Sequence, residues 1–155
     1  MATTEDILGQ YPFAYIYANT TSTAQNIGTG SMTSVLFNAE QSKTSITHST
    51  STNTDQFTIV QAGYYIIDAS IAIGESTGGD VRTLQITVNG AQYSIEDKPP
   101  LNPPYADNAQ HMMHHSTGNF AVNDIIRLQV YQDSGGGLDL IVDVNKTYMK
   151  IMRVR

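Results

Sequence analysis

The segment 56–69, QFTIVQAGYYIIDA, most constrains what this chain can fold into. Apolar side chains recur at every second position on both sides of Gly63, and the alternation continues to residue 73. This period is typical of β-strands that pack one face on a core. The residues predicted to face that core are Phe57, Ile59, Tyr65, Ile67, Ala69, Ile71 and Ile73. The pattern predicts one corner of an antiparallel β-sandwich, and we expect Gly63 to occupy a backbone angle or a close contact that only glycine accepts.

The opposite face of the same strand is also apolar, at Tyr64, Ile66 and Ala72. A strand that is apolar on both faces needs cover on both sides. The chain shows no amphipathic helix pattern that could supply the second cover, so we expect another copy of the chain to do so. The predicted subunit interface is formed by Tyr64, Ile66, Tyr148 and Met152.

Composition excludes several classes of protein. The chain has 155 residues, which suits one domain with a core of its own. It has no cysteine, so neither a disulfide framework nor thiol chemistry is available. A net charge of −6 argues against nucleic acid as the partner. Residues 1–6 are polar and acidic and no apolar run approaches the ~20 residues of a membrane span, so we expect neither export nor a membrane anchor.

Four stretches resemble one known family. Phe57, five residues and then Gly63-x-Tyr65-x-apolar-x-small is similar to the signature corner of the jelly rolls shared by the globular head of the complement q subunit and the tumour-necrosis-factor superfamily. Three further parts agree: residues 15–25 with 34–38 resemble the paired opening strands, 84–90 the central strand and turn, and 122–132 with 148–154 the last two strands. The likeness covers about residues 12 to 155 in order.

The resemblance implies an all-β fold, an antiparallel ten-stranded jelly-roll sandwich that assembles as a homotrimer. We expect residues 11–155 to form this domain and residues 1–10 to form a flexible arm. The chain departs from the family at Asn123-Asp124, where Gly-Asp is usual. Asparagine tolerates a left-handed backbone, so we expect the turn to be kept. The closing strand also lacks the family's aromatic and glycine pair.

Segment 98–105 holds four of the five prolines and is predicted to be stiff and extended. Two interpretations remain open, a rigid crossover between strands, which we favour, and a preorganised contact loop. The residues of that contact loop would be Pro99, Pro100, Pro103, Pro104 and Tyr105.

Two groups of side chains are candidate metal ligands. On a strand, His111 and His115 share one face and His114 takes the other, so one chain cannot close a tetrahedral site from them alone. A threefold axis could bring copies of one histidine together, but we favour polar strand residues near a subunit interface. The aspartates that could hold calcium are Asp124, Asp133, Asp139 and Asp143, whose spacing matches no EF-hand loop. We therefore expect no metal and no other cofactor.

Catalytic motifs are not found. The sequence has no Gly-x-Ser-x-Gly elbow and no His-Glu-x-x-His, and a carboxylate pair such as Glu75 and Asp80 would fit any acidic loop. Without a convergent set of catalytic groups, the sequence predicts a binding protein and not an enzyme.

Acidic, cysteine-free heads of this kind resemble virion proteins of tailed bacteriophages. That resemblance implies a capsid decoration or cement protein, assembled in the host cytoplasm and bound to the major capsid protein or another virion protein. In this hypothesis the arm contacts the shell together with one end of the sandwich, through Thr3, Thr4, Glu5, Asp6, Ile7 and Leu8. The alternative is the receptor-binding tip of a tail fibre or spike that recognises host glycan or protein. Because the chain has no fibrous shaft pattern, we favour decoration.

Overall fold

The structure of the protein is a computed structural model. It describes residues 13–17, 24–41, 46–74, 76, 78–98, 109–143 and 145–154. The predicted arm and the proline segment 99–105 lie outside these ranges, so both expectations remain predictions. Among the described residues no helix is long and apolar enough to span a membrane.

The described residues form β-strands and turns, without any helix. Their strands are β1 (Phe13–Tyr17), β2 (Asn26–Ile27), β3 (Thr33–Ser34), β4 (Ala39–Gln41), β5 (Ile46–Thr47), β6 (Phe57–Ile59), β7 (Gly63–Gly74), β8 (Arg82–Val88), β9 (Ala91–Lys98), β10 (Ala109–Phe120), β11 (Ile125–Gln132), β12 (Leu138–Asp139) and β13 (Tyr148–Arg153). The count exceeds the expected ten because much of the first half is broken into pieces of two or three residues.

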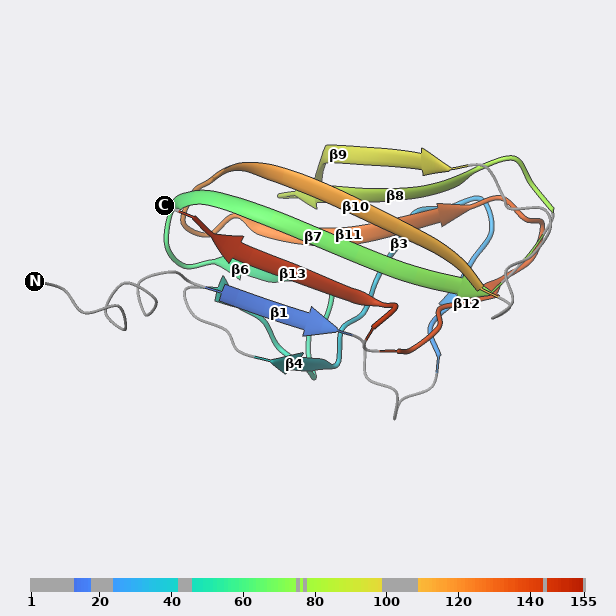
Figure 1. Ribbon diagram of the computed structural model, residues 1–155, viewed down its shortest axis with the longest axis horizontal. Coiled ribbons are helices and arrows are strands. Elements are labelled where there is room, and N and C mark those ends of the chain that lie inside the picture. The colour runs from blue at the N-terminus through green and yellow to red at the C-terminus, as the bar shows by residue number, and fades with distance from the viewer. Residues whose placement is uncertain are drawn as a thin grey trace, which may run out of the picture.

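Two antiparallel sheets form the sandwich (Figure 1). One has five strands in the order β10-β7-β13-β1-β4. The other has six, in the order β5-β6-β11-β8-β9 with β3 also paired to β11, and β12 and β2 form a separate pair. Every pairing is antiparallel. The predicted all-β, antiparallel jelly roll is confirmed.

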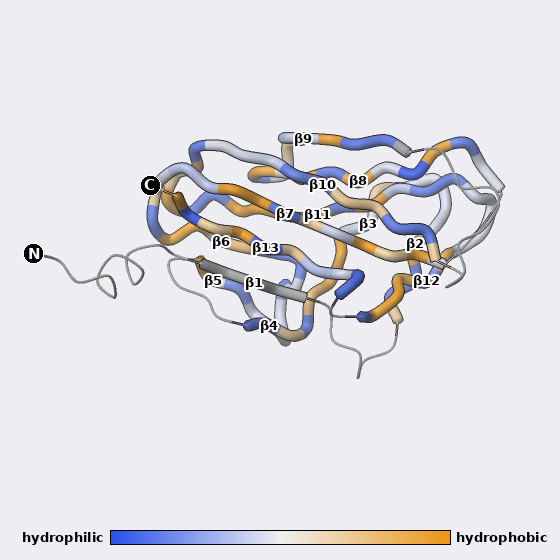
Figure 2. Tube along the Cα trace, viewed as in Figure 1, coloured by the Kyte–Doolittle hydropathy of each residue, from blue (hydrophilic) through white to orange (hydrophobic). Residues whose placement is uncertain are grey.

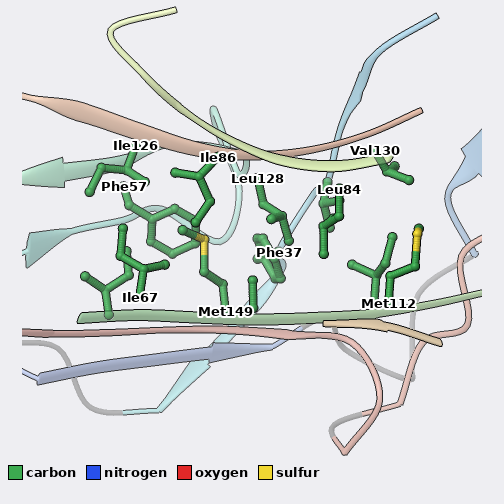
Figure 3. Packing of buried hydrophobic residues seen from close by; sticks show 14 of the residues in the cluster. Phe37, Phe57, Ile67, Leu84, Ile86, Met112, Ile126, Leu128, Val130 and Met149 are labelled. Carbon is green, nitrogen blue, oxygen red and sulfur yellow. The ribbon is translucent and has the colours of Figure 1, made fainter. Parts of the chain in front are cut away.

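The core lies between the two sheets (Figure 3). All seven residues predicted to face it, from Phe57 to Ile73, are at most 1% exposed. Leu84, Ile86, Leu128 and Val130 meet them from the six-stranded sheet. Figure 2 shows hydrophobic positions recurring along the strands of both sheets. Full burial of one such aliphatic side chain stabilises the fold by about 1.5–3 kcal/mol, which is why the period-two pattern determines the strand faces.

The corner at Gly63 differs in part from expectation. Four glycines among the described residues have positive φ, and Gly63 is not one of them, so the expected special backbone angle is wrong. Gly63 is the first residue of β7, paired with Phe120 in an extended ladder. The corner is instead fixed by Tyr65, whose buried hydroxyl donates to the Gln61 carbonyl at 2.5 Å. Burial raises the pKa of this hydroxyl. The expected close contact at Gly63 stays a prediction.

The turn at Asn123 confirms its prediction. Asn123 has φ 72°, the left-handed conformation that asparagine tolerates and that the usual glycine would also supply. Asn89 and Gly90, at φ 53° and 82°, form the two-residue turn between β8 and β9. Two consecutive residues of positive φ match the right-handed twist of a hairpin.

Candidate functional site: the outer face of the five-stranded sheet

The five-stranded sheet has one face on the core and one face that the chain leaves partly uncovered. On β7, Tyr65 and Ile67 point inward, so Tyr64 and Ile66 lie on the outer face. The register places Met152 of β13 opposite Ile66, and Tyr148 lies on the same face of β13. The structure therefore brings the four residues of the predicted interface onto one surface. All four are half-buried in the single chain.

Ala72 departs from this account. It is fully buried within one chain, and so the expectation that it needs cover from another copy is wrong. Its carbonyl accepts a hydrogen bond from the Ile141 amide at 2.7 Å, and its amide donates to Thr147 Oγ1 at 3.3 Å. The segment that leads into β13 thus covers this end of β7. The covering residues, near 141 and 147, are far from Ala72 in sequence, so the local pattern around Ala72 cannot indicate them.

A charged row crosses the apolar face. His115 of β10 contacts Asp68 of β7, with 2.5 Å between Nδ1 and Oδ1. Lys150 of β13 lies opposite Asp68 in the strand register, on the other side of β7. The row separates Tyr64, Ile66 and Met152 from Tyr148. The outer face therefore combines apolar contact area with the carboxylate of Asp68, the ammonium of Lys150 and the imidazole of His115.

A hollow of about 430 Å³ opens beside this row. It is lined by Asp68, Ala69, Glu96, Met113, His114, His115, Tyr148 and Lys150. The sequence interpretation named the histidines and Tyr148 but missed Asp68, Lys150 and Glu96. The local pattern contained a weak signal, since Asp68 and Lys150 are the charged residues on the outer faces of β7 and β13, which otherwise carry apolar side chains and Ser70.

The three histidines lie as the strand geometry predicts. His111 and His115 are on the outer face and His114 is on the other side of β10. His114 is 7% exposed, and its Nε2 lies 2.8 Å from Ser94 Oγ while its Nδ1 is 3.6 Å from the Glu96 carboxylate, too far for a hydrogen bond. Burial lowers the pKa of His114, with the Glu96 charge opposing it. Within the described ranges, no three His, Cys, Asp or Glu side chains converge as metal ligands.

The four aspartates considered as calcium ligands belong to different turns. Asp124 accepts from the Ala121 amide, Asp139 from the Asn26 side chain and Asp143 from the Asn145 amide. Asp133 accepts from the backbone amides of Val81 and Asp80, which lower its pKa, and from the guanidinium of Arg82. Their carboxylates are used within the fold, so the structure does not bring them together into one cage.

Arg82 is a buried charged residue of the kind found in functional sites, and the sequence interpretation did not consider it. Its side chain is fully buried, and the guanidinium donates to the carbonyls of Val81, Ser76 and Gly78 as well as to Asp133 at 3.1 Å. A buried charge is tolerated when it is paired and hydrogen-bonded in this way. Arg82 therefore joins the β7–β8 connection to the end of β11 and serves structure.

Several polar side chains on the outer face of the six-stranded sheet form hydrogen bonds within the chain. Gln85 Nε2 donates to Gln129 Oε1 at 2.7 Å, and Gln129 Nε2 donates to Ser34 Oγ at 3.3 Å. Thr83 donates to Asp97 at 2.5 Å, and Arg127 is paired with Asp55 at 3.0 Å. Thr83 and Gln85 are buried in the single chain although they face away from the core.

No family model matches the chain, and no curated protein matches it in sequence. Solved structures do match. Murine APRIL at pH 5.0 is 9% identical, with a TM-score of 0.69 over 94% of this chain and 100% of that chain. Eiger TNF from S. frugiperda is 10% identical, with a TM-score of 0.70 over 94% of this chain and 93% of that chain. At this identity the likeness establishes the fold, and the chain has a TNF-like jelly roll.

Proposed function

We propose that this chain is a non-enzymatic binding protein that acts as a homotrimer, with the outer face of the five-stranded sheet as its subunit interface. The observation that carries the proposal is the set of half-buried apolar side chains on that face, Tyr64, Ile66, Tyr148 and Met152. Burying them against another copy removes apolar surface from water, at roughly 25 cal/mol per Å². The likeness to TNF-like jelly rolls supports three copies, each contacting its two neighbours through this face.

Binding is favoured over catalysis by the way the polar side chains are used. Asp124, Asp133, Asp139 and Asp143 are hydrogen-bonded within the fold, Arg82 is paired with Asp133, and His48 Nδ1 lies 2.9 Å from Glu40 Oε2. The hollow beside the charged row is lined by two carboxylates, two imidazoles and the Tyr148 hydroxyl, but by no serine, threonine or cysteine. These residues do not form the chain of nucleophile, general base and orienting group that nucleophilic catalysis requires.

For the biological role, we propose a capsid decoration or cement protein of a tailed bacteriophage, with the major capsid protein as its partner in the virion. The support is compositional: the chain is acidic, lacks cysteine and has only 14% charged residues. Such a surface suits a dense protein assembly that remains soluble before it docks. Mass spectrometry of purified virions tests this role, because it measures whether the protein is present and in how many copies.

Deleting residues 1–10 should leave a folded trimer that no longer binds heads. An arm that orders only on its partner contributes to binding without contributing to the core. Particles assembled with the deleted form should break at lower heat or milder osmotic shock, while adsorption to host cells should not change. If head stability is unchanged and soluble protein instead competes with phage for adsorption, the receptor-binding alternative is correct.

A further inference from the structure

The turn between β8 and β9 consists of Asn89 and Gly90, which form the one Asn-Gly pair in the sequence. Asparagine is chemically labile, because the backbone amide of the next residue can attack its side-chain carbonyl. Glycine obstructs this attack least, since it has no side chain. Both residues are exposed, and apart from the chain neighbours of Gly90 no atom lies within 4 Å of a side chain built there. The pair is therefore open to water.

The structure holds the Asn89 side chain at both ends of its amide. Oδ1 accepts from the Ile125 backbone amide at 2.9 Å, and Nδ2 donates to Asp124 Oδ1 at 2.8 Å. The Asn89 backbone amide donates to the Ile125 carbonyl at 2.9 Å. Asn89 thus extends the β8–β11 ladder by one pair beyond Val88 and Ile126, with its side chain in place of a backbone carbonyl.

Asp124 joins this turn to a second one. Its other carboxylate oxygen, Oδ2, accepts from the Ala121 amide at 2.7 Å in the β10–β11 turn. Each carboxylate oxygen of Asp124 therefore has one donor, and Asn89 supplies one of the two. Hydrogen bonds to an ionised carboxylate are roughly twice as strong as neutral ones. The Asn89 side chain is accordingly the link between the two turns.

We infer that Asn89 is a modification site at which water converts the side-chain amide into a carboxylate, and that Asp124 sets the rate of this conversion. In the first step the Gly90 backbone nitrogen forms a bond to Asn89 Cγ, and its proton leaves with Nδ2 as ammonia. In the second step water opens the resulting five-membered imide at either carbonyl, which gives aspartate or isoaspartate. One water is consumed and one ammonia is released. The inference does not depend on the proposed assembly or role.

The attack does not take place while the side chain is held. Nδ2 must separate from Asp124 before it can leave, and turning Cγ toward the Gly90 nitrogen draws Oδ1 away from the Ile125 amide. The reactive arrangement therefore forms only when the turn opens locally. The population of the open turn falls as these bonds become stronger.

The product does not fit the present contact. A carboxylate at position 89 would place two negatively charged oxygens across the 2.8 Å that the hydrogen bond now spans, with no donor between them. Like charges at this separation repel each other. The β8–β9 turn would then be released from the β10–β11 turn, so the modification loosens the contact between them.

Incubation of the full chain at neutral pH, followed by peptide mass spectrometry, measures the conversion of amide to carboxylate. Asn53 and Asn123 are matched controls, since both are exposed and have positive φ but are followed by threonine and aspartate. We expect position 89 to convert faster than either control. Asp124→Asn keeps an acceptor for the Ala121 amide and loses the one for Asn89, so it should raise the rate at position 89 roughly tenfold or more.

Three results of this experiment would overturn the inference. The first is conversion at position 89 that is no faster than at the controls. The second is an equal rate at position 89 in wild type and Asp124→Asn. The third is an equal rise at Asn53 in that variant, because unfolding of the whole chain and not release of one turn would then be the cause.

A pair of variants tests the consequence without the reaction. Asn89→Asp should lower the melting temperature by several degrees. Asn89→Asp combined with Asp124→Asn should restore it, because donor and acceptor are then exchanged and the amide at position 124 donates to the carboxylate at position 89. If Asn89→Asp melts as wild type does, or the double variant melts no higher than the single one, the product does not break this contact and the inference is wrong.

Discussion

The outer faces of the two sheets differ in how their side chains are buried and hydrogen-bonded. On the six-stranded sheet, Gln85, Gln129 and Ser34 form a chain of hydrogen bonds, and Thr83 and Gln85 are buried without help from another molecule. On the five-stranded sheet, Tyr64 and Ile66 remain half-buried. Both faces belong to sheets that already cover the core. On the six-stranded face these polar side chains are satisfied within the chain, although Ile95 is 43% exposed there, whereas on the five-stranded face the described residues leave Ile66 and Met152 half-buried opposite each other.

In the proposed trimer, this difference is the reason for placing the contact on the five-stranded sheet. Side chains whose polar groups already bond to each other gain little from a partner, because docking would exchange one set of hydrogen bonds for another. Half-buried aromatic and aliphatic side chains gain the remaining burial. In the proposed trimer, the row of His115, Asp68 and Lys150 would lie within the contact, although the His115–Asp68 contact is already made inside each chain.

The largest expected effect comes from charging the outer face of the five-stranded sheet. Tyr64→Asp together with Met152→Asp should convert the trimer into a folded monomer, because each chain would otherwise bury two unpaired carboxylates. Ile95→Asp is the matched control, since Ile95 is 43% exposed on β9 of the other sheet, paired with Gln85. Light scattering should report a trimer for the control. Dissociation of both, or of neither, would remove the distinction between the two faces.

A smaller effect is expected on the outer face of the six-stranded sheet. Gln85→Leu leaves Gln129 Oε1 without its donor, while Gln129 Nε2 keeps its bond to Ser34, and should lower the free energy of unfolding by about 1–3 kcal/mol. Gln85→Leu with Gln129→Leu should cost less than the sum of the single changes, because both polar partners are removed. Urea unfolding measures this coupling. The variants should remain trimers, and a change in oligomeric state would show that this face also takes part in assembly.

The smallest effect concerns the pH dependence of stability through His114 of β10, which lies beside β9 of the other sheet. Burial lowers the pKa of His114 below its ordinary value of 6.5. The unfolded chain therefore takes up a proton before the folded chain does, so the His114 contribution to stability is fully present above pH 6.5 and is lost as the pH falls through the folded pKa. His114→Gln should reduce this loss. Unfolding curves at several pH values between neutral and acidic would contradict the assignment if the variant and wild type lost stability equally.

The strand faces were predictable because burial follows a local period. The alternation from Phe57 to Ile73 identified the core side, and Asn123 was identified because few residues accept positive φ. The same alternation placed His114 on the face opposite His115. In each of these cases the sequence neighbours alone determine the geometry.

Features that depend on distant segments were missed. Ala72 looked uncovered because the residues that cover it, near 141 and 147, are far away in sequence. The buried guanidinium of Arg82 requires carbonyls and a carboxylate from two separate connections. Gly63 was expected to have a special backbone angle or a close contact; the expected angle is wrong, and the Tyr65 hydroxyl bonds across that corner to the Gln61 carbonyl. Period and propensity carry no information on such long-range pairings.

The mass of the wild-type protein in solution tests the central claim most directly. Light scattering or sedimentation at micromolar concentration should give three times the 16.9 kDa of one chain. The wild-type trimer should persist on dilution. The variant with Tyr64→Asp and Met152→Asp should instead have the mass of one chain. A mass of one chain at micromolar concentration would contradict the account, because the apolar area of that face would then have no partner of its own kind.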